Sequence, residues 1–395
     1  MARLIVFVAF LDLFSQFPVV SPYVRAMGAG PLMIGVSVAT YDVANLFGNL
    51  VAPFVLARWG RKRPLVGGLL TAAGALVLYG VTTAAAPFAL VRGIHGLAQA
   101  ILSPGAFVLL SESVPARRRA QAMGTAGVFI AIAAVLGPSF AGIAAGRAGP
   151  RAVFLAVAVL LALAALVTAL RYRADRAPEL PAEPAGRVTW GTLWQLAQRP
   201  SLIGAYAAAL TWTAGIGTLV VHLPLLLETP AIRGRAYAVY ALVALVMFAG
   251  PAPWLANRFG RMRPTSAGLA LVGLALLTLG FSSALAPTGL PGASNVYSGM
   301  ALFGLGFGIL FPAVTALVAD ATQPHERGAA YGIFYAAYSL GVAAGEIGSG
   351  QLARAFGPES PAPFLAFGAV ALVMAPAILL VGRAARTRTA LEPVT

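Results

Sequence analysis

The chain has 395 residues, of which 59% are hydrophobic and only 10% charged, and its formal net charge is +15. This composition excludes an ordinary soluble domain and predicts a membrane protein with several spans. The absence of cysteine excludes disulfide bonds, thiolate metal sites and a cysteine nucleophile, and no cofactor is expected.

Twelve membrane-spanning helices are predicted from apolar stretches of about 20 residues. The first six are expected at residues 4–24, 31–56, 64–84, 87–112, 120–143 and 151–170. The last six are expected at residues 201–227, 236–256, 264–286, 296–319, 328–354 and 361–382. No small-residue cleavage site follows the first stretch, so we interpret it as a retained span rather than a signal peptide.

An internal repeat relates the two sets of helices. The segment Pro53 to Pro64 (PFVLARWGRKRP) returns 200 positions later as PWLANRFGRMRP, and a second repeat at an offset of 208 aligns Pro104 with Pro312. Parallel repeats of this kind are a transporter architecture. We therefore expect an all-α membrane protein with two pseudo-symmetric six-helix bundles around a central cavity that opens alternately to either side.

The only long polar stretch, residues 171–199, has the composition of a solvated linker. It divides the chain into an N-terminal bundle at residues 1–170 and a C-terminal bundle with a short cytoplasmic tail at residues 200–395. At its end, one helical face carries Trp190, Leu193, Trp194 and Ala197. This end either lies flat in the membrane interface or is an ordinary entry into the next span.

Charge distribution sets the expected orientation. With both termini cytoplasmic, 20 of the 27 Lys and Arg residues lie in inner segments and 6 in outer ones. This is the positive-inside bias, and the basic clusters next to helix ends would attract anionic membrane lipid. The basic charge is thus explained by topology, and nucleic acid is not an expected partner.

Ionisable residues inside predicted spans are candidate functional groups, because a carboxylate at the centre of an inserting helix costs about 2.5 to 3.5 kcal/mol. Asp12 and Asp42 fit a site near the membrane midplane, and we rank Asp12 first. A carboxyl that alternates between a desolvated and a cation-paired setting can take up and release a proton. The alternative is structural: capping a helix or pairing with Arg92. Glu346, nearer the outer end, is either a gate residue or a proton site.

Several further side chains follow at helical spacing. Arg92, His95, Gln99 and Ser103 project along one face and either line a water-filled cavity or form a static hydrogen-bonded stripe. Gln16 shares a face with Asp12, and Asn45 shares one with Asp42. Aromatic stripes are formed by Tyr331, Tyr335 and Tyr338, and by Phe303, Phe307 and Phe311. These stripes either line a substrate space or pack between helices, and Trp212 and His222 are weaker candidates.

The whole chain resembles the major facilitator superfamily, whose inner loop after the second span reads approximately G-x-L-A-D-R-x-G-R-K/R. Within Pro53 to Lys62, the matching residues are Arg58, Gly60, Arg61 and Lys62, and the second half repeats Arg258, Gly260 and Arg261. The resemblance implies a conformational role for these residues. Ala57 replaces the aspartate that latches the outward-facing state in the family, so the alternative is that the basic residues only fix topology.

Two more patterns carry the resemblance. Arg92, His95, Gly96 and Ala100 resemble the fourth-span pattern R-x-x-Q-G-x-x-x-A, whose buried arginine is linked to proton handling, with His95 in place of glutamine. In the fifth span, Gly137, Pro138 and Gly142 are similar to the G-x-x-x-G-P-x-x-G-G pattern of the family's exporters. This similarity implies export and a conformational role for these three residues.

We therefore expect a secondary active transporter and not an enzyme: a proton-coupled exporter of small amphipathic or hydrophobic compounds. No Gly-Lys-Ser/Thr phosphate loop is present, which argues against direct ATP drive. Substrate-binding candidates are Gln16, Asn45, His95, Gln99, Tyr331, Tyr335 and Tyr338. The alternatives are an importer, symporter or uniporter of a sugar, organic acid or lipid-like metabolite, and a non-transporting membrane sensor or assembly component. We expect a monomer in the plasma (inner) membrane, with a small-molecule substrate, protons and membrane lipid as partners.

Overall fold

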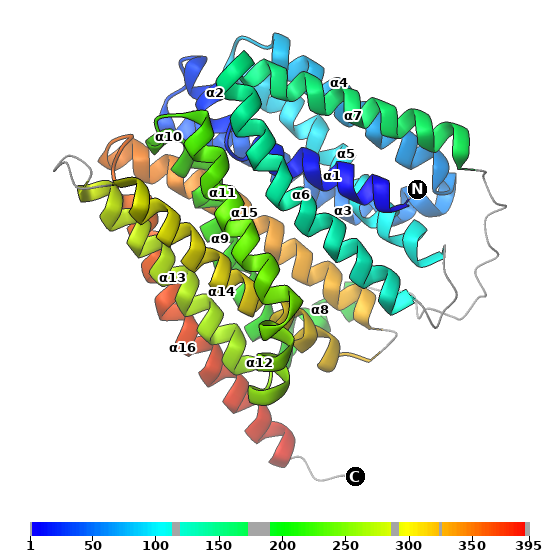
Figure 1. Cartoon of the computed structure of the whole chain (residues 1–395). Coiled ribbons are helices and arrows are strands. Elements are labelled where there is room, and N and C mark those ends of the chain that lie inside the picture. The colour runs from blue at the N-terminus through cyan, green and yellow to red at the C-terminus, as the bar shows by residue number, and fades with distance from the viewer. Residues whose placement is uncertain (1, 113–118, 173–189, 286–291, 324–325, 392–395) are drawn as a thin grey trace. The chain divides into compact units, whose positions relative to one another are not determined.

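The computed structural model describes residues 2–112, 119–172, 190–285, 292–323 and 326–391, which form helices and no strand within those ranges (Figure 1). The first half contains α1 (Ala2–Gln16), α2 (Val20–Ala26), α3 (Pro31–Trp59), α4 (Lys62–Val81), α5 (Ala85–Glu112), α6 (Arg119–Ala148) and α7 (Pro150–Arg171). The second contains α8 (Trp190–Gln198), α9 (Pro200–Val221), α10 (Leu223–Leu226), α11 (Pro230–Ala249), α12 (Pro251–Phe259), α13 (Met262–Leu285), α14 (Gly292–Asp320), α15 (Arg327–Phe356) and α16 (Ala362–Leu391). The predicted all-α class is confirmed.

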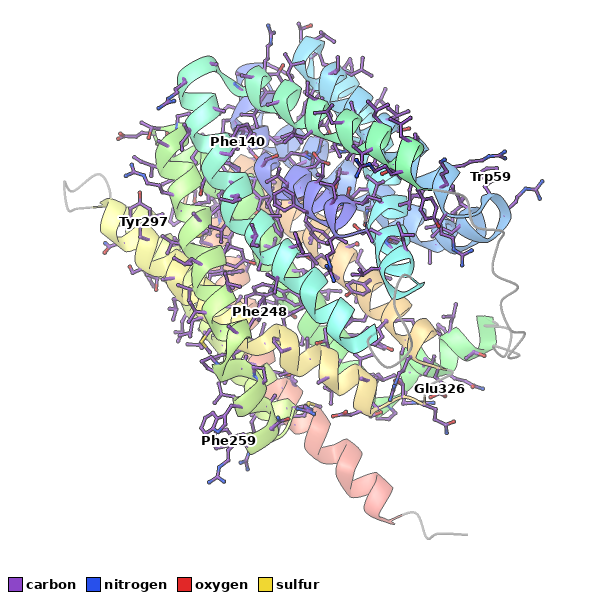
Figure 2. All side chains as sticks on the ribbon, turned by 45° about the vertical axis from the view of Figure 1, so that its right-hand side comes forward. Trp59, Phe140, Phe248, Phe259, Tyr297 and Glu326 are labelled. Carbon is purple, nitrogen blue, oxygen red and sulfur yellow. The ribbon has the colours of Figure 1, made fainter. Side chains whose placement is uncertain are left out.

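The apolar helices are long enough to cross a bilayer. Within the described ranges, nine helices meet the length and hydropathy expected of a span, and α1 with α2 makes a tenth if that bent pair is one span. The spans predicted at residues 31–56 and 328–354 coincide with the helices α3 and α15, which are not among these nine. Trp59, Phe140 and Phe259 project from their helices (Figure 2) and are 56%, 38% and 45% exposed. Exposed apolar surface of this extent fits contact with lipid.

Three predicted spans are interrupted rather than continuous. The first bends by 46° between α1 and α2, next to Pro18. The seventh is divided at His222, ahead of Pro224, and the eighth at Gly250, ahead of Pro251. Proline has no N–H group and its ring clashes with the preceding turn, so helices end or kink at these positions.

The chain forms two compact units, and neither matches one half of the sequence. Unit 1 comprises the described residues within 1–180, 219–241 and 346–358, and unit 2 comprises those within 181–218, 242–345 and 359–395. Helix pairing repeats inside the units, because α4 packs against α5 and α7 in unit 1, and α13 packs against α14 and α16 in unit 2. In the two six-helix sets, α4, α5 and α7 occupy the same positions as α13, α14 and α16. The same helix pairs therefore form in both sets, as the repeat predicted. The division of the chain at residues 171–199 stays a prediction.

Two glycines show the repeat at the level of the backbone. Gly60 follows α3 with φ +71°, and Gly260 follows α12 with φ +75°. They stand 200 positions apart in the duplicated segment. A positive φ is readily adopted by glycine and strained for other residues, so each copy of the basic loop needs glycine at its turn.

The helix predicted at the end of the linker is α8. Trp194 is 67% exposed, whereas Leu196 is buried, so α8 has one inward and one outward side. Arg199, directly after α8, makes two hydrogen bonds of 2.7 and 2.8 Å to the carboxylate of Glu326, and a third to the carbonyl of Ala321. These contacts connect the start of α9 to the segment between α14 and α15 within unit 2.

Candidate functional site

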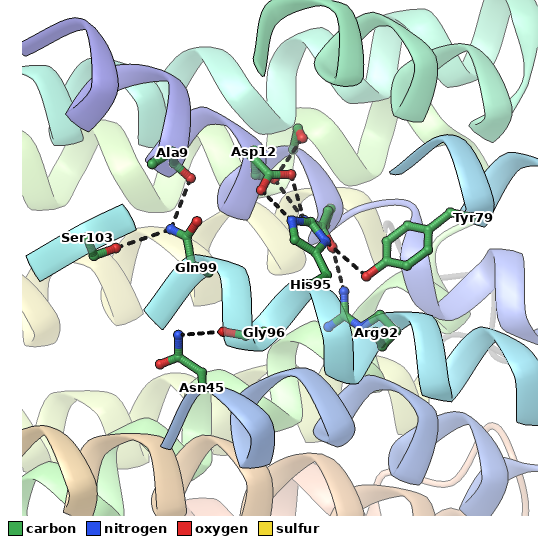
Figure 3. A network of polar contacts seen from close by, with 11 residues as sticks. Ala9, Asp12, Asn45, Tyr79, Arg92, His95, Gly96, Gln99 and Ser103 are labelled. Carbon is green, nitrogen blue, oxygen red and sulfur yellow. Dashed lines mark hydrogen bonds and ion pairs between the residues drawn. The ribbon is translucent and has the colours of Figure 1, made fainter. Parts of the chain in front are cut away.

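A buried polar network joins α1 to α5 within unit 1 (Figure 3). Asp12 on α1 is fully buried, and its Oδ2 atom lies 2.8 Å from Nε2 of His95 on α5. Its Oδ1 atom accepts a hydrogen bond of 2.9 Å from Nε2 of Gln16, one turn further along α1. The spacing of four residues places Asp12 and Gln16 on the same helical face, as predicted from the sequence.

The network continues from His95 to α4. Nδ1 of His95 lies 3.0 Å from the hydroxyl of Tyr79, and the imidazole ring contacts the rings of Tyr41 and Tyr79. When Nε2 donates to Asp12, Nδ1 can accept from the hydroxyl, and when both ring nitrogens are protonated the hydroxyl oxygen can accept instead. The imidazole thus has partners in both protonation states. Tyr79 was not among the predicted residues, because a single tyrosine in an apolar helix indicates packing.

Arg92 enters the network through an intermediary. Its NH1 group donates to Oε1 of Gln16, its NH2 group donates to the carbonyl of Val38 at 3.1 Å, and the guanidinium lies 4.8 Å from the ring centre of Tyr41. The basic partner that contacts Asp12 directly is therefore His95 and not Arg92. Arg92 links the side chain of Gln16 on α1 to the backbone of α3.

Asp42 and Glu346 form a second acidic pair in unit 1. Asp42 of α3 and Glu346, in the unit 1 part of α15, lie close enough for their carboxyl groups to interact. Glu346 is buried and Asp42 is half-buried. The two helices approach closely because Gly35 of α3 packs on the backbone of Glu346, where a β-carbon would clash. Two neighbouring carboxyl groups disfavour a charge on both, and Arg92 interacts electrostatically with both.

The remaining predicted residues of α5 and α3 are also hydrogen-bonded. Gln99 donates to the carbonyl of Ala9 at 3.3 Å and to the hydroxyl of Ser103 at 3.2 Å. Asn45 donates to the carbonyl of Gly96 at 3.3 Å (Figure 3). These bonds hold α1 and α3 against α5 next to Asp12 and His95.

In unit 2, the predicted tyrosines of α15 have different surroundings. The hydroxyl of Tyr331 donates to the carbonyl of Thr315 on α14 at 2.8 Å. Tyr335 is 46% exposed. Tyr338 packs edge-on against Trp212 of α9, with ring centres 5.3 Å apart. The stripe predicted on α15 therefore divides into a residue that ties α15 to α14, an exposed ring and a member of an aromatic cluster.

The aromatic cluster consists of Trp212, Phe248, Phe307, Phe311 and Tyr338, from α9, α11, α14 and α15. Trp212 stacks on Phe307 at 5.3 Å, and Phe248 contacts Phe307 edge-on at the same distance. Trp212 is fully buried, yet its indole N–H group has no hydrogen-bond partner within the part of the chain that the structure describes. A buried donor among aromatic rings is suited to an amphipathic ligand with an acceptor group.

The glycines of the fifth-span pattern lie at backbone-to-backbone contacts in unit 1. A β-carbon at Gly142 of α6 would lie 2.6 Å from the carbonyl oxygen of Pro230 and 2.9 Å from Cα of Gly234 on α11. A β-carbon at Gly234 would lie 2.5 Å from the carbonyl oxygen of Pro138. A β-carbon at Gly137 would lie 3.1 Å from Cβ of Phe14 and from the backbone nitrogen of Ser15 on α1, a looser contact. The pattern thus builds close helix contacts of the kind that small residues permit.

The second copy of the basic loop is held by polar contacts. Arg261 donates to the carboxylate of Asp320 at 2.9 Å and to the side-chain oxygen of Asn257 at 3.1 Å. Asn257 occupies the position of the family aspartate. Arg58 and Arg258 are exposed, and Lys62 is half-buried. The first-half counterpart of Asn257, Ala57, has its side chain outside the described part of the structure.

Comparison with known proteins finds a family model, related sequences and a solved structure that are similar to this chain. The family model described as Major Facilitator Superfamily matches residues 4–299 and 284–394. The chain is 27% identical over 165 residues to Multidrug resistance protein 2 of Bacillus subtilis, a match that spans 42% of this chain and 41% of that protein. It is 27% identical over 374 residues to Riboflavin transporter RfnT of Brucella anthropi, spanning 90% of this chain and 88% of that protein. A bacterial homolog of the human lysosomal transporter Spinster has the same fold, with a TM-score of 0.78, 16% identity and coverage of 100% and 98%.

Proposed function

The chain belongs to the major facilitator superfamily and is a multi-pass secondary transporter rather than an enzyme, and we propose that it exports small amphipathic or hydrophobic compounds in exchange for protons. The observation that carries the proposal is the fully buried pair of Asp12 and His95. Buried ionisable groups within spans are characteristic of proton relays.

The Asp12 pair can change its protonation without losing its hydrogen bonds. An added proton is held on the carboxyl or the imidazole, with Tyr79 as the second partner of His95. The resulting change in charge reaches Arg92 through Gln16, and Arg92 holds the carbonyl of Val38 on α3. Protonation on α1 and α5 is thereby coupled to the position of α3.

The Asp42 pair supplies a second proton-dependent contact in this proposal. With one shared proton, Asp42 and Glu346 hold α3 against α15 within unit 1. Loss of that proton leaves two carboxylates side by side, which repel each other in a poorly solvated site. Proton release therefore favours separation of α3 from this part of α15, as alternating access requires.

Substrate chemistry is inferred from unit 2 and from the relatives. The aromatic cluster offers ring faces and the unpaired indole N–H group of Trp212. Together with the fifth-span glycines and the similarity to Multidrug resistance protein 2, it favours export of amphipathic compounds. The similarity to RfnT over 90% of the chain favours a second candidate, transport of riboflavin or a related metabolite in either direction. We place the protein in the plasma (inner) membrane as a monomer with both termini cytoplasmic.

The test is proton movement in liposomes that contain the purified protein and a pH-sensitive dye. Gradients of lipophilic cations, neutral drugs and riboflavin are imposed in turn. Export by antiport predicts that protons move against one class of compound. It also predicts that Asp12→Asn lowers the rate of this coupled transport by at least about tenfold. The matched control is Glu359→Gln, an exposed carboxylate outside the network, which should transport like the wild type. Transport by Asp12→Asn with unchanged pH dependence would show that the proton mechanism is wrong.

A further inference from the structure

A cavity of about 200 Å³ lies within unit 1, where the end of α2 and the start of α3 meet α10 and the unit 1 part of α15. Figure 1 shows α2 and α10 beside each other at this end of unit 1. Three polar side chains line the cavity, Arg25, His222 and Ser349. The residues of the Asp12 network do not line it, so it is separate from the proposed proton site.

Ser349 indicates that the cavity holds a polar ligand. It is fully buried and lines the cavity, and its hydroxyl group has no hydrogen-bond partner among the described residues. Buried hydroxyls nearly always have a partner, because an unpaired one destabilises the fold. A serine in a helix commonly bonds a carbonyl of the preceding turn, and Ser349 instead leaves its hydroxyl available to the cavity.

The start of α3 supplies positive potential to the same space. α3 is 29 residues long, and Pro31 and Ile34 of its first turn line the cavity. Its N-cap residue, Gly30, has no side chain that could cap the helix, and Pro31 has no N–H group. The next N–H groups, of Leu32 and Met33, have no acceptor within the helix. Unsatisfied N–H groups and the helix dipole together favour an anion at this end.

Arg25 adds a full positive charge. One hydrogen bond to the carbonyl of Leu225, at 3.3 Å, uses a single one of its five N–H donors. Arg233 of α11 lies close enough to interact electrostatically with Arg25. None of the described residues that line the cavity is acidic. The sum of these charges selects against cations and for an anion.

The rest of the wall is aliphatic, with Ile34, Val221 and Leu225 among the lining residues. We propose that this cavity binds a small monocarboxylate with a short aliphatic chain. The carboxylate lies between Arg25, the Ser349 hydroxyl and the first turn of α3, where charge-assisted hydrogen bonds are strong. The chain packs on the aliphatic wall, and the volume restricts it to a few carbon atoms. A bound carboxylate bridges α2 and α3 to α10 and α15, and so stabilises their packing within unit 1.

The test is direct binding to the purified full chain in detergent, followed by saturation-transfer NMR and by thermal unfolding. Sodium butyrate is the probe, with butyramide as its uncharged counterpart and sodium chloride at equal ionic strength as the inorganic anion. We expect saturable binding of butyrate with a rise in unfolding temperature, and little binding of butyramide. Arg25→Gln should weaken binding by about tenfold or more, and Ser349→Ala by several-fold. The control is Arg354→Gln, which changes an exposed arginine of α15 outside the cavity and should bind butyrate like the wild type.

Absence of saturable butyrate binding to the wild type would overturn the proposal, as would equal binding of butyramide. Full competition by chloride, with no gain in affinity from the propyl chain of butyrate, would overturn the carboxylate and point to an inorganic anion. If Arg25→Gln does not fold, Ile34→Phe tests the same site by filling the cavity and should abolish binding. Binding is measured without transport, so either result leaves the proposed export to be judged by its own assay.

Discussion

Nε2 of His95 lies 2.8 Å from Oδ2 of Asp12, and both side chains are fully buried. At the position of His95, the fourth-span pattern of the family carries a glutamine, which forms hydrogen bonds but does not take up a proton. Histidine is the side chain that most readily changes charge near neutral pH. The substitution therefore adds a titratable group beside the acid of α1, in contact with it.

Replacing His95 with glutamine separates hydrogen bonding from proton binding. We expect His95→Gln to keep downhill exchange of substrate, because an amide can still donate to Asp12. Uphill transport driven by a pH gradient should fall by at least about tenfold. Counterflow and pH-driven uptake in the same liposomes measure the two activities. Loss of both to the same degree would mean that His95 only positions helices.

Removing the Tyr79 hydroxyl tests the second partner of His95. In Tyr79→Phe the ring contacts remain, but Nδ1 of His95 loses its partner at 3.0 Å. An unsatisfied buried group costs about 1 to 3 kcal/mol, so the unfolding temperature should fall and the pH profile of transport should shift. Tyr297→Phe, outside the network, is the control. An unchanged pH profile in Tyr79→Phe would remove the hydroxyl from the proton path.

The polar stripe of α1 could be predicted because helical spacing alone places Gln16 beside Asp12. The partner across the helix interface could not, since the choice between Arg92 and His95 depends on how α1 and α5 are rotated against each other. Tyr79 could not be predicted either, because a lone tyrosine in an apolar helix gives no sequence pattern that indicates a functional role. The pairing of Asp42 with Glu346 joins residues 304 positions apart, and only packing of α3 on α15 reveals it. Spans followed from composition, whereas the site depends on contacts between helices distant in sequence.

The contact between α6 and α11 gives a prediction with a matched pair of variants. In Gly142→Ala the new β-carbon would meet the carbonyl oxygen of Pro230 at 2.6 Å. Forcing an atom into such a contact costs about 1 to 3 kcal/mol, so stability and transport should both fall. Gly146→Ala, one turn further along α6, has nothing within 4 Å and should be neutral or slightly stabilising. Unfolding temperature and flux are the readouts, and equal behaviour of the two variants would refute the close contact.

The stability that the charged Arg199 contributes through its ion pair with Glu326 is predicted not to change with pH near neutrality. Hydrogen bonding to Glu326 raises the pKa of the Arg199 guanidinium. A raised pKa contributes stability that is fully present below the unfolded value and is lost only as pH rises through the folded one, far above neutrality for arginine. The pair is partly exposed, so Arg199→Gln should cost at most about 1 kcal/mol. Its difference from the wild type should be constant between about pH 6 and pH 9, and thermal unfolding over that range measures it.

Gly260 combines the duplicated turn with the polar contacts of the second basic loop. Its φ of +75° is strained for any residue with a β-carbon, so Gly260→Ala should cost about 1 to 2 kcal/mol. Distortion of the turn should also displace Arg261 from Asp320 and Asn257, because Arg261 is the next residue. Gly332→Ala is the control: Gly332 lies in α15 of the same unit with nothing within 4 Å, and alanine favours the helix there. Thermal unfolding should rank the control at or above the wild type and Gly260→Ala below both. If Gly260→Ala loses transport and Asp320→Asn does not, the turn matters through its backbone, and if both lose it, the contact of Arg261 with Asp320 is part of the conformational cycle.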